Sequence, residues 1–271
     1  MIKEPAVNNS ATKPVFTRQL DRFWRVFGTG LSFSVFGIGG LFMGIFMFPL
    51  MFVLVRNRVS RQIIARRLIG RAFAIFLGMM KALGCISYAI RGDKRSAEAG
   101  QQLIIANHPT LIDVVFLVAL FPLADCVVKE AVMRNPFMRG VVRPANYISS
   151  DEPGILLETC VERIKSGASL ILFPEGTRSR QNQSLEFKLG AASIAVRSGA
   201  GILPVVIKCS QPGFLAKNHP WYRVPPERPL ITIDIHPQIS LREITPGDLE
   251  PRQAARKLNS ALLDFFQGAI A

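Results

Sequence analysis

The hydrophobic pattern sets one long apolar run apart from the rest of the chain. Between Gly28 and Val55 there are 28 consecutive residues without a charge, whereas a helix needs only about 20 apolar residues to cross a bilayer. Four glycines gather between positions 37 and 44, and Pro49 follows them. The run predicts either one tilted membrane span or a bent hairpin that enters the bilayer and returns, with a buried core helix as the alternative.

The next segment combines apolar residues at helical spacing with a dense set of arginines. Ile63, Ile64 and Leu68 fall on one face, and six arginines lie between positions 56 and 71. This pattern predicts a basic amphipathic helix lying in the membrane interface. An ordinary surface helix of the following domain is the alternative.

From residue 86 onward, short apolar runs alternate with helical stretches, as in an α/β domain. The predicted strands are Ile86–Ile90, Gln102–Ala106, Cys126–Val128, Leu170–Phe173, Gly201–Ile207 and Leu230–Ile235. The predicted helices are Leu111–Leu120, Ile155–Ser166, Ala191–Arg197 and Pro251–Phe266, and residues 210–228 are expected to form a long ordered loop.

These elements predict a single α/β domain with a central mixed sheet flanked by helices, preceded by a membrane-associated helical segment. We expect a basic flank at 1–26, a membrane-embedded and amphipathic helical segment at 27–85, and the α/β domain at 86–271.

The distribution of charge supports a membrane location over nucleic-acid binding. The chain is 49% hydrophobic and carries a net charge of +14, of which +9 falls in residues 1–71, beside the apolar run. Basic residues in that position attract anionic head groups and favour the cytoplasmic side. We therefore expect membrane lipids and no nucleic acid as partners, and a location at the inner, cytoplasmic membrane with the domain facing the cytoplasm. The four cysteines are widely spaced, so neither disulfides nor a metal site are expected.

A candidate catalytic pair follows the predicted strand Gln102–Ala106. The chain reads Asn-His-Pro-Thr-Leu-Ile-Asp from position 107 to 113. An abrupt turn at Pro109 would let Asp113 approach His108, fix its tautomer and support it as a general base. The structural alternative is that His108 caps a helix whose dipole Asp113 complements.

A second polar cluster follows the predicted strand Leu170–Phe173. Here the chain reads Phe-Pro-Glu-Gly-Thr-Arg-Ser from position 173 to 179. Gly176 permits a sharp turn, Arg178 offers a planar fork suited to phosphate or carboxylate, and Glu175 can balance it or bind a hydroxyl. A plain turn with a surface ion pair is the alternative.

Together the two clusters resemble the lysophospholipid and glycerolipid acyltransferase family, in which an Asn-His-x-x-x-x-Asp block precedes a Phe-Pro-Glu-Gly-Thr-Arg-Ser block. The resemblance spans roughly residues 86 to 208 and includes a proline in an apolar strand, Pro204, and the Phe-Lys-x-Gly sequence at 187–190. It implies an O-acyltransferase similar to the 1-acylglycerol-3-phosphate acyltransferases, using acyl-CoA or acyl carrier protein as co-substrate and no other cofactor. The implied general base is His108, oriented by Asp113. The implied acceptor-binding residues are Glu175, Gly176, Thr177, Arg178 and Lys188.

One segment departs from the family. Where relatives have Gly-x-Ile-x-x-x-Arg, this chain reads Ala-Asn-Tyr-Ile-Ser-Ser-Asp from 145 to 151, without the arginine. Arg139 or Arg143 is a candidate replacement, and we include Arg143 among the substrate-binding residues. The acceptor, a lysophospholipid or a lipid other than a glycerolipid, therefore remains open.

Two other functions compete with acyl transfer. A hydrolase lacks support because the chain has no Gly-x-Ser-x-Gly elbow and no His-Glu-x-x-His sequence. A non-catalytic basic membrane adaptor remains the alternative from another class.

Overall fold

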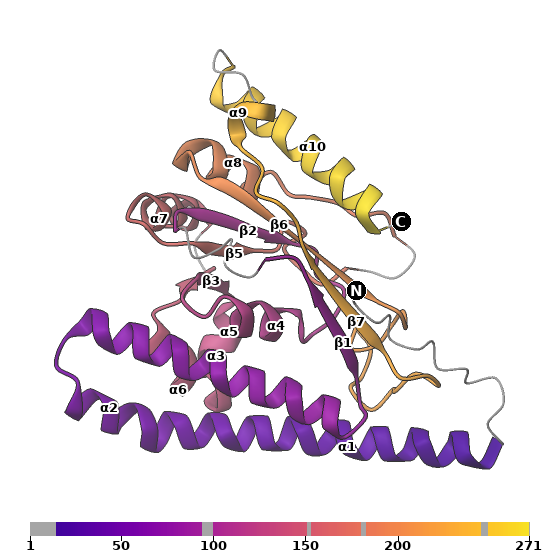
Figure 1. Ribbon diagram of the computed structural model, residues 1–271. Coiled ribbons are helices and arrows are strands. Elements are labelled where there is room, and N and C mark those ends of the chain that lie inside the picture. The colour runs from indigo at the N-terminus through magenta and orange to yellow at the C-terminus, as the bar shows by residue number, and fades with distance from the viewer. Residues whose placement is uncertain (1–14, 94–99, 151–152, 180–182, 245–248, 271) are drawn as a thin grey trace.

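The computed structural model describes residues 15–93, 100–150, 153–179, 183–244 and 249–270 (Figure 1). The strands are β1 Ser87–Arg91, β2 Gln102–Ala106, β3 Asp125–Val128, β4 Ile148–Ser149, β5 Leu170–Leu172, β6 Gly201–Cys209 and β7 Leu230–Ile235. The helices are α1 Val15–Phe42, the π-helical η2 Met43–Met47, α2 Phe48–Leu54, α3 Arg58–Ala82, α4 Asp113–Leu120, α5 Glu130–Arg134, α6 Pro136–Ala145, α7 Pro153–Lys165, α8 Gly190–Ser198, α9 Leu241–Ile244 and α10 Pro251–Ile270.

The strands form one mixed sheet in the order β1-β7-β6-β2-β5-β3-β4. Every neighbouring pair is parallel except β6 and β7, which are antiparallel. Alternate residues of a strand point to opposite faces, and in β2 Ile104 joins the core under α3 and α4 while Leu103 and Ile105 join the core under α7, α8 and α10. Figure 1 shows these helices on the two sides of the sheet. The predicted mixed sheet flanked by helices is therefore confirmed.

The long apolar run forms a continuous helix rather than a bent hairpin. α1, η2 and α2 follow one another from Val15 to Leu54, with a single π-helical turn at 43–47, and the chain reverses only after Val55. The side chain of Asn57 then caps α3 by accepting a hydrogen bond from the Ser60 N–H. Helical backbone hydrogen bonds are local, so the mid-run glycines lower helix propensity without ending the helix. The predicted hairpin within 28–55 is therefore wrong.

The part Gln19–Leu54 of this helix is long and apolar enough to cross a membrane, and only 17% of its most apolar window is buried. At about 1.5 Å per residue, its 36 residues span roughly 54 Å, more than the ~30 Å hydrocarbon core. The helix also begins inside the predicted basic flank, at Val15. Residues 15–26 and the apolar run thus form one element.

Glycines allow the N-terminal helix to touch the domain closely. A Cβ built on Gly44 would come within 3.0 Å of the Gly140 Cα in α6, and one on Gly40 within 2.6 Å of the Phe137 carbonyl oxygen. Met43 and Phe48 belong to the same buried cluster as Ile104 of β2. The N-terminal helices and the sheet therefore share a hydrophobic core.

The arginine-rich helix α3 is a helix of this domain. Its apolar side, including Ile69, Phe73 and Leu77, is buried in the core that α4 also lines. Arg66 is buried too, and donates to the carbonyl oxygens of Ala145 at 2.9 Å and Leu123 at 2.8 Å. The prediction of an amphipathic helix with its apolar face in the membrane interface is therefore wrong, and the surface-helix alternative describes α3 better.

Candidate active site

The two polar clusters meet because β2 and β5 are adjacent and parallel, so both strands end at the same edge of the sheet. Catalytic groups of α/β folds gather at such carboxyl edges. Asn107 fixes the turn after β2, since its side chain accepts from the Ile207 N–H and donates to the Ile207 carbonyl, both at 2.7 Å. The start of the turn after β2 is thereby tied to β6.

His108 and Asp113 form the predicted pair. Nδ1 of His108 lies 2.9 Å from Oδ2 of Asp113. The Asp113 carboxylate is fully buried and also accepts hydrogen bonds from the backbone N–H of Thr110 at 2.6 Å and from its hydroxyl at 2.5 Å. In the tautomer that places a proton on Nδ1, facing Asp113, the Nε2 atom of His108 is a hydrogen-bond acceptor.

The turn after β5 holds the backbone of His108. The backbone N–H of His108 donates to Oε1 of Glu175 at 2.7 Å, and the His108 carbonyl accepts from the backbone N–H of Ser179 at 2.7 Å. The Phe173 ring stacks on the imidazole, with ring centroids 4.2 Å apart. Phe173 is predicted as the end of a strand and the first residue of the second polar block, but its contact with His108 is not predicted, because stacking between turns has no signature in one sequence. Glu175 thus holds the backbone of His108 instead of pairing with Arg178.

Burial raises the pKa of Glu175, and hydrogen bonds from Ser179 and the His108 N–H oppose this rise. A folded-state pKa above the ordinary 4.5 means that the fold favours the protonated carboxyl. Its contribution to stability is present below pH 4.5 and is lost as pH rises through the raised pKa.

Glu175→Gln should therefore gain stability relative to the wild type as pH increases from about 4 to 7, because glutamine keeps the Oε1 acceptor without ionising. Thermal unfolding followed by circular dichroism at both pH values measures the difference. Glu186→Gln, at an exposed position, is the matched control. A difference between wild type and Glu175→Gln that stays constant over this range would contradict the assignment.

Gly176 and Lys188 are close neighbours in the same turn region. Gly176 has a φ of +67°, which favours glycine, and a Cβ at this position would lie 3.0 Å from the Lys188 Nζ. The backbone N–H of Lys188 donates to the Pro174 carbonyl at 2.9 Å. Lys188 therefore lies beside the Glu175 turn. Thr177 belongs to that turn and is half-buried.

The sequence predicts that the Arg178 guanidinium binds the substrate, whereas in the structure it is hydrogen-bonded to the backbone. Its Nη1 donates to the carbonyl oxygens of Leu215 and Ala216, each at 3.0 Å. The Leu111 N–H, from the His108 turn, donates to the same Leu215 carbonyl at 2.9 Å. Arg178 thus joins the turn after β5 to the 210–228 loop, which also accepts a hydrogen bond from the turn after β2. Because this contact is long-range, the sequence alone did not predict it.

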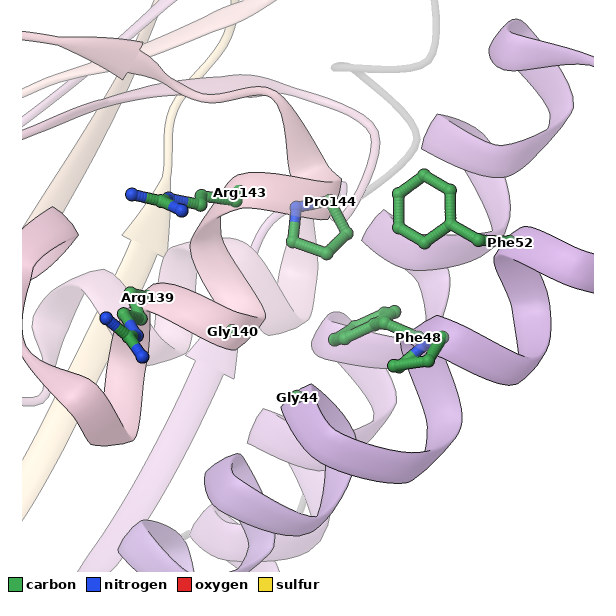
Figure 2. Close-up of a pocket in the computed structure, with 8 residues that line it drawn as sticks. Gly44, Phe48, Phe52, Arg139, Gly140, Arg143 and Pro144 are labelled. Carbon is green, nitrogen blue, oxygen red and sulfur yellow. The ribbon is translucent and has the colours of Figure 1, made fainter.

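Arg143 lines a hollow of about 320 Å³ between α6 and the N-terminal helix. In Figure 2 Arg139 and Arg143 extend from one side of α6, while Phe48 and Phe52 face that helix. Among the described residues, no hydrogen bond or ion pair joins Arg143 to His108 or Glu175. The role of Arg143 in substrate binding stays a prediction.

The cysteines are poor nucleophiles, because burial raises the pKa of Cys126 to about 12 and those of Cys160 and Cys209 to about 11. The pKa of Cys85 is also raised by burial. Within the described ranges, no group of three His, Cys, Asp or Glu residues is arranged to hold a metal ion.

The sheet and the two turns at its carboxyl edge define an α/β domain with a candidate site, and comparison with known proteins shows what this domain resembles. Residues 87–208 match the family described as Acyltransferase. It is 34% identical over 119 residues to the 1-acyl-sn-glycerol-3-phosphate acyltransferase of Helicobacter pylori, covering 41% of this chain and 50% of the relative. The enzyme of the same name from Pseudomonas aeruginosa is 28% identical over 145 residues, covering 51% of this chain and 55% of the relative.

The chain thus spans about half the length of the curated relatives that it matches. A crystal structure of the 1-acyl-sn-glycerophosphate acyltransferase from Thermotoga maritima is similar in fold, with a TM-score of 0.65 over 92% of this chain and 98% of that one, at 20% identity.

Proposed function

We propose that this protein transfers a fatty acyl group from the thioester of acyl-CoA or acyl carrier protein to the hydroxyl of a lysophospholipid, with 1-acylglycerol-3-phosphate as the first acceptor to test. The observation that carries the proposal is the 2.9 Å contact between Nδ1 of His108 and the buried Asp113, which leaves Nε2 available as a base. The names of the relatives support the choice of acceptor.

In the proposed reaction, Nε2 of His108 takes the proton of the acceptor hydroxyl as its oxygen attacks the thioester carbonyl. A new C–O ester bond forms and the C–S bond breaks. The proton then passes from His108 to the departing thiolate, so that the products are an ester and a free thiol. Asp113 stabilises the imidazolium between the two proton transfers. Backbone N–H groups of the turns are the candidate donors to the oxyanion.

The proposed location is the cytoplasmic face of a membrane, the inner membrane in a bacterial cell. An amphipathic acceptor resides in the bilayer, whereas the acyl thioester arrives from the cytosol. The long, largely exposed apolar helix at the N-terminus supports this placement. Exposed Arg56, Arg58 and Arg67 lie where they can meet anionic head groups.

Arg143 is proposed as an auxiliary contact for an anionic acceptor, supported by its exposure and by its position on a hollow that α2 also lines. A charge-assisted hydrogen bond is worth about 1.5–3 kcal/mol. Arg143→Ala should therefore raise KM for a phosphate-bearing acceptor by about 10-fold or more, with kcat little changed. Steady-state kinetics test this, with the exposed Arg134→Ala as control. An unchanged KM would remove Arg143 from the substrate site.

The proposed function is tested by offering labelled acyl-CoA and acyl-carrier-protein donors, together with a panel of lysophospholipid and non-glycerolipid acceptors, to the purified protein. Mass spectrometry identifies the lipid product. Acylation of 1-acylglycerol-3-phosphate is the expected result. Transfer only to a non-glycerolipid would replace the acceptor, and no transfer to any acceptor would favour the membrane adaptor.

A further inference from the structure

The exposed face of the N-terminal helix is apolar, and its buried face carries polar side chains. Exposed large apolar residues recur three or four positions apart along α1 and η2: Leu20, Phe23, Trp24, Phe27, Leu31, Val35, Ile38, Phe42, Ile45 and Phe46. On the inward side Arg25, Thr29 and Ser32 are buried. A helix on the surface of a soluble domain has the opposite arrangement. The helix lies along the lower edge of the molecule in Figure 1. Its outward apolar stripe is suited to lipid.

A distant segment of the chain adds two aromatic residues to this stripe. A Cβ built on Gly30 of α1 would lie 3.0 Å from two ring atoms of Trp221, so the indole rests on the helix backbone at that glycine. The guanidinium of Arg25 donates to the Pro226 carbonyl at 2.7 Å, which ties the same loop to α1 a second time. Trp221 and Tyr222 nevertheless remain 46% and 59% exposed.

The chemistry of this shared surface matches the boundary between lipid tails and head groups. Tryptophan and tyrosine combine an apolar ring with a polar edge, and they concentrate at membrane interfaces. Exposed arginines adjoin both aromatic groups, Arg22 on the helix and Arg223 on the loop. Anionic head groups complement such cations. A lipid surface therefore fits the patch better than a second apolar protein face.

We propose that Trp221 and Tyr222 form a second membrane contact, supplied by the C-terminal half of the chain, which sits at head-group depth beside α1. The contact is linked to the site, because the same loop provides the Leu215 carbonyl that binds Arg178 and the Leu111 N–H. Docking on the bilayer thereby fixes the catalytic turns relative to the membrane surface. This inference rests on the membrane location in the proposed function and not on the acyl-transfer chemistry.

The chain contains only two tryptophans, Trp24 and Trp221, which makes a direct test practical. Trp24→Phe leaves Trp221 as the single reporter, and Trp221→Phe leaves Trp24. Each full-length variant is bound to vesicles of anionic phospholipid that carry bromine at a defined depth of the acyl chain. We expect Trp221 fluorescence to be quenched most strongly by the shallowest bromines.

The outcomes separate this inference from the proposed function. Quenching of Trp24 without quenching of Trp221 would overturn the loop contact and leave the membrane location intact. Absence of quenching for both residues would overturn both. Shielding of Trp221 from aqueous acrylamide without any bromine quenching would mean that protein covers the patch, and would also overturn the proposal.

A binding measurement provides an independent readout. The double variant Trp221→Ala, Tyr222→Ala should weaken vesicle partitioning about tenfold, because two aromatic rings no longer enter the interface. The control changes exposed Ile155 on α7, which packs on the opposite face of the sheet, to alanine. Circular dichroism confirms folding of each variant. Equal partitioning of the double variant and the control would contradict the contact.

Discussion

Replacement of His108 by alanine is expected to lower kcat for acyl transfer by about 10²–10⁴-fold, the usual contribution of a general base. The imidazole is the group that Asp113 orients from one side and Phe173 packs against. Its loss leaves the acceptor hydroxyl with no base to receive its proton, whereas the donor and acceptor still bind. KM should consequently change far less than kcat.

The control for this substitution is His219→Ala, because His219 is half-buried in the 210–228 loop and lies outside the catalytic turns. Both variants should unfold at temperatures close to that of the wild type. Comparable activity of His108→Ala and His219→Ala would show that His108 is not the base. A loss confined to His108→Ala would support the mechanism.

The largest expected effect on stability comes from Arg66→Ala. The guanidinium of Arg66 is buried, forms an ion pair with the buried Asp125, and donates to the carbonyls of Leu123 and Ala145. Removing one member of a buried ion pair leaves an uncompensated charge and typically costs about 3–5 kcal/mol. Arg163, whose Nη1 lies 3.8 Å from Asp125, compensates only in part.

Chemical denaturation in detergent measures this loss, and the neighbouring exposed Arg67→Ala is the matched control. The control should change the free energy of unfolding by less than about 0.5 kcal/mol. If both substitutions had the same small effect, the network around Asp125 would not stabilise the fold. Because Arg66 connects α3 to α6 and to the turn before β3, its loss should also loosen the N-terminal helices.

Local patterns were sufficient to predict much of the sheet. The bounds predicted for β2 and β7 agree with the structure, because apolar runs there are bounded by turn residues. The two-residue strand β4 and the short helices α5 and α6 were not predicted. A two-residue strand has no periodicity to detect, and Pro144 lies inside α6, where a helix is disfavoured.

In the candidate site, too, contacts within one turn could be predicted from the sequence, whereas contacts between distant segments could not. The contact of His108 with Asp113 was predictable because it lies within one turn. The bonds of Arg178 to Leu215 and of Glu175 to the His108 backbone join segments far apart in sequence. The burial of Arg66 could not be predicted either. Arg66 lies in an arginine-rich segment that is typical of an exposed helix, and its partner Asp125 is distant in the sequence. Long-range pairing decided which charged residues support the fold.

The most direct test of the central claim is the release of free thiol from an acyl thioester donor, measured with and without a lysophospholipid acceptor. Direct attack by a hydroxyl that His108 activates predicts no release without acceptor, and with acceptor one thiol for each ester formed. A burst of one thiol per protein molecule in the absence of acceptor would indicate an acyl-enzyme and contradict the account. Sustained thiol release without ester would identify a hydrolase.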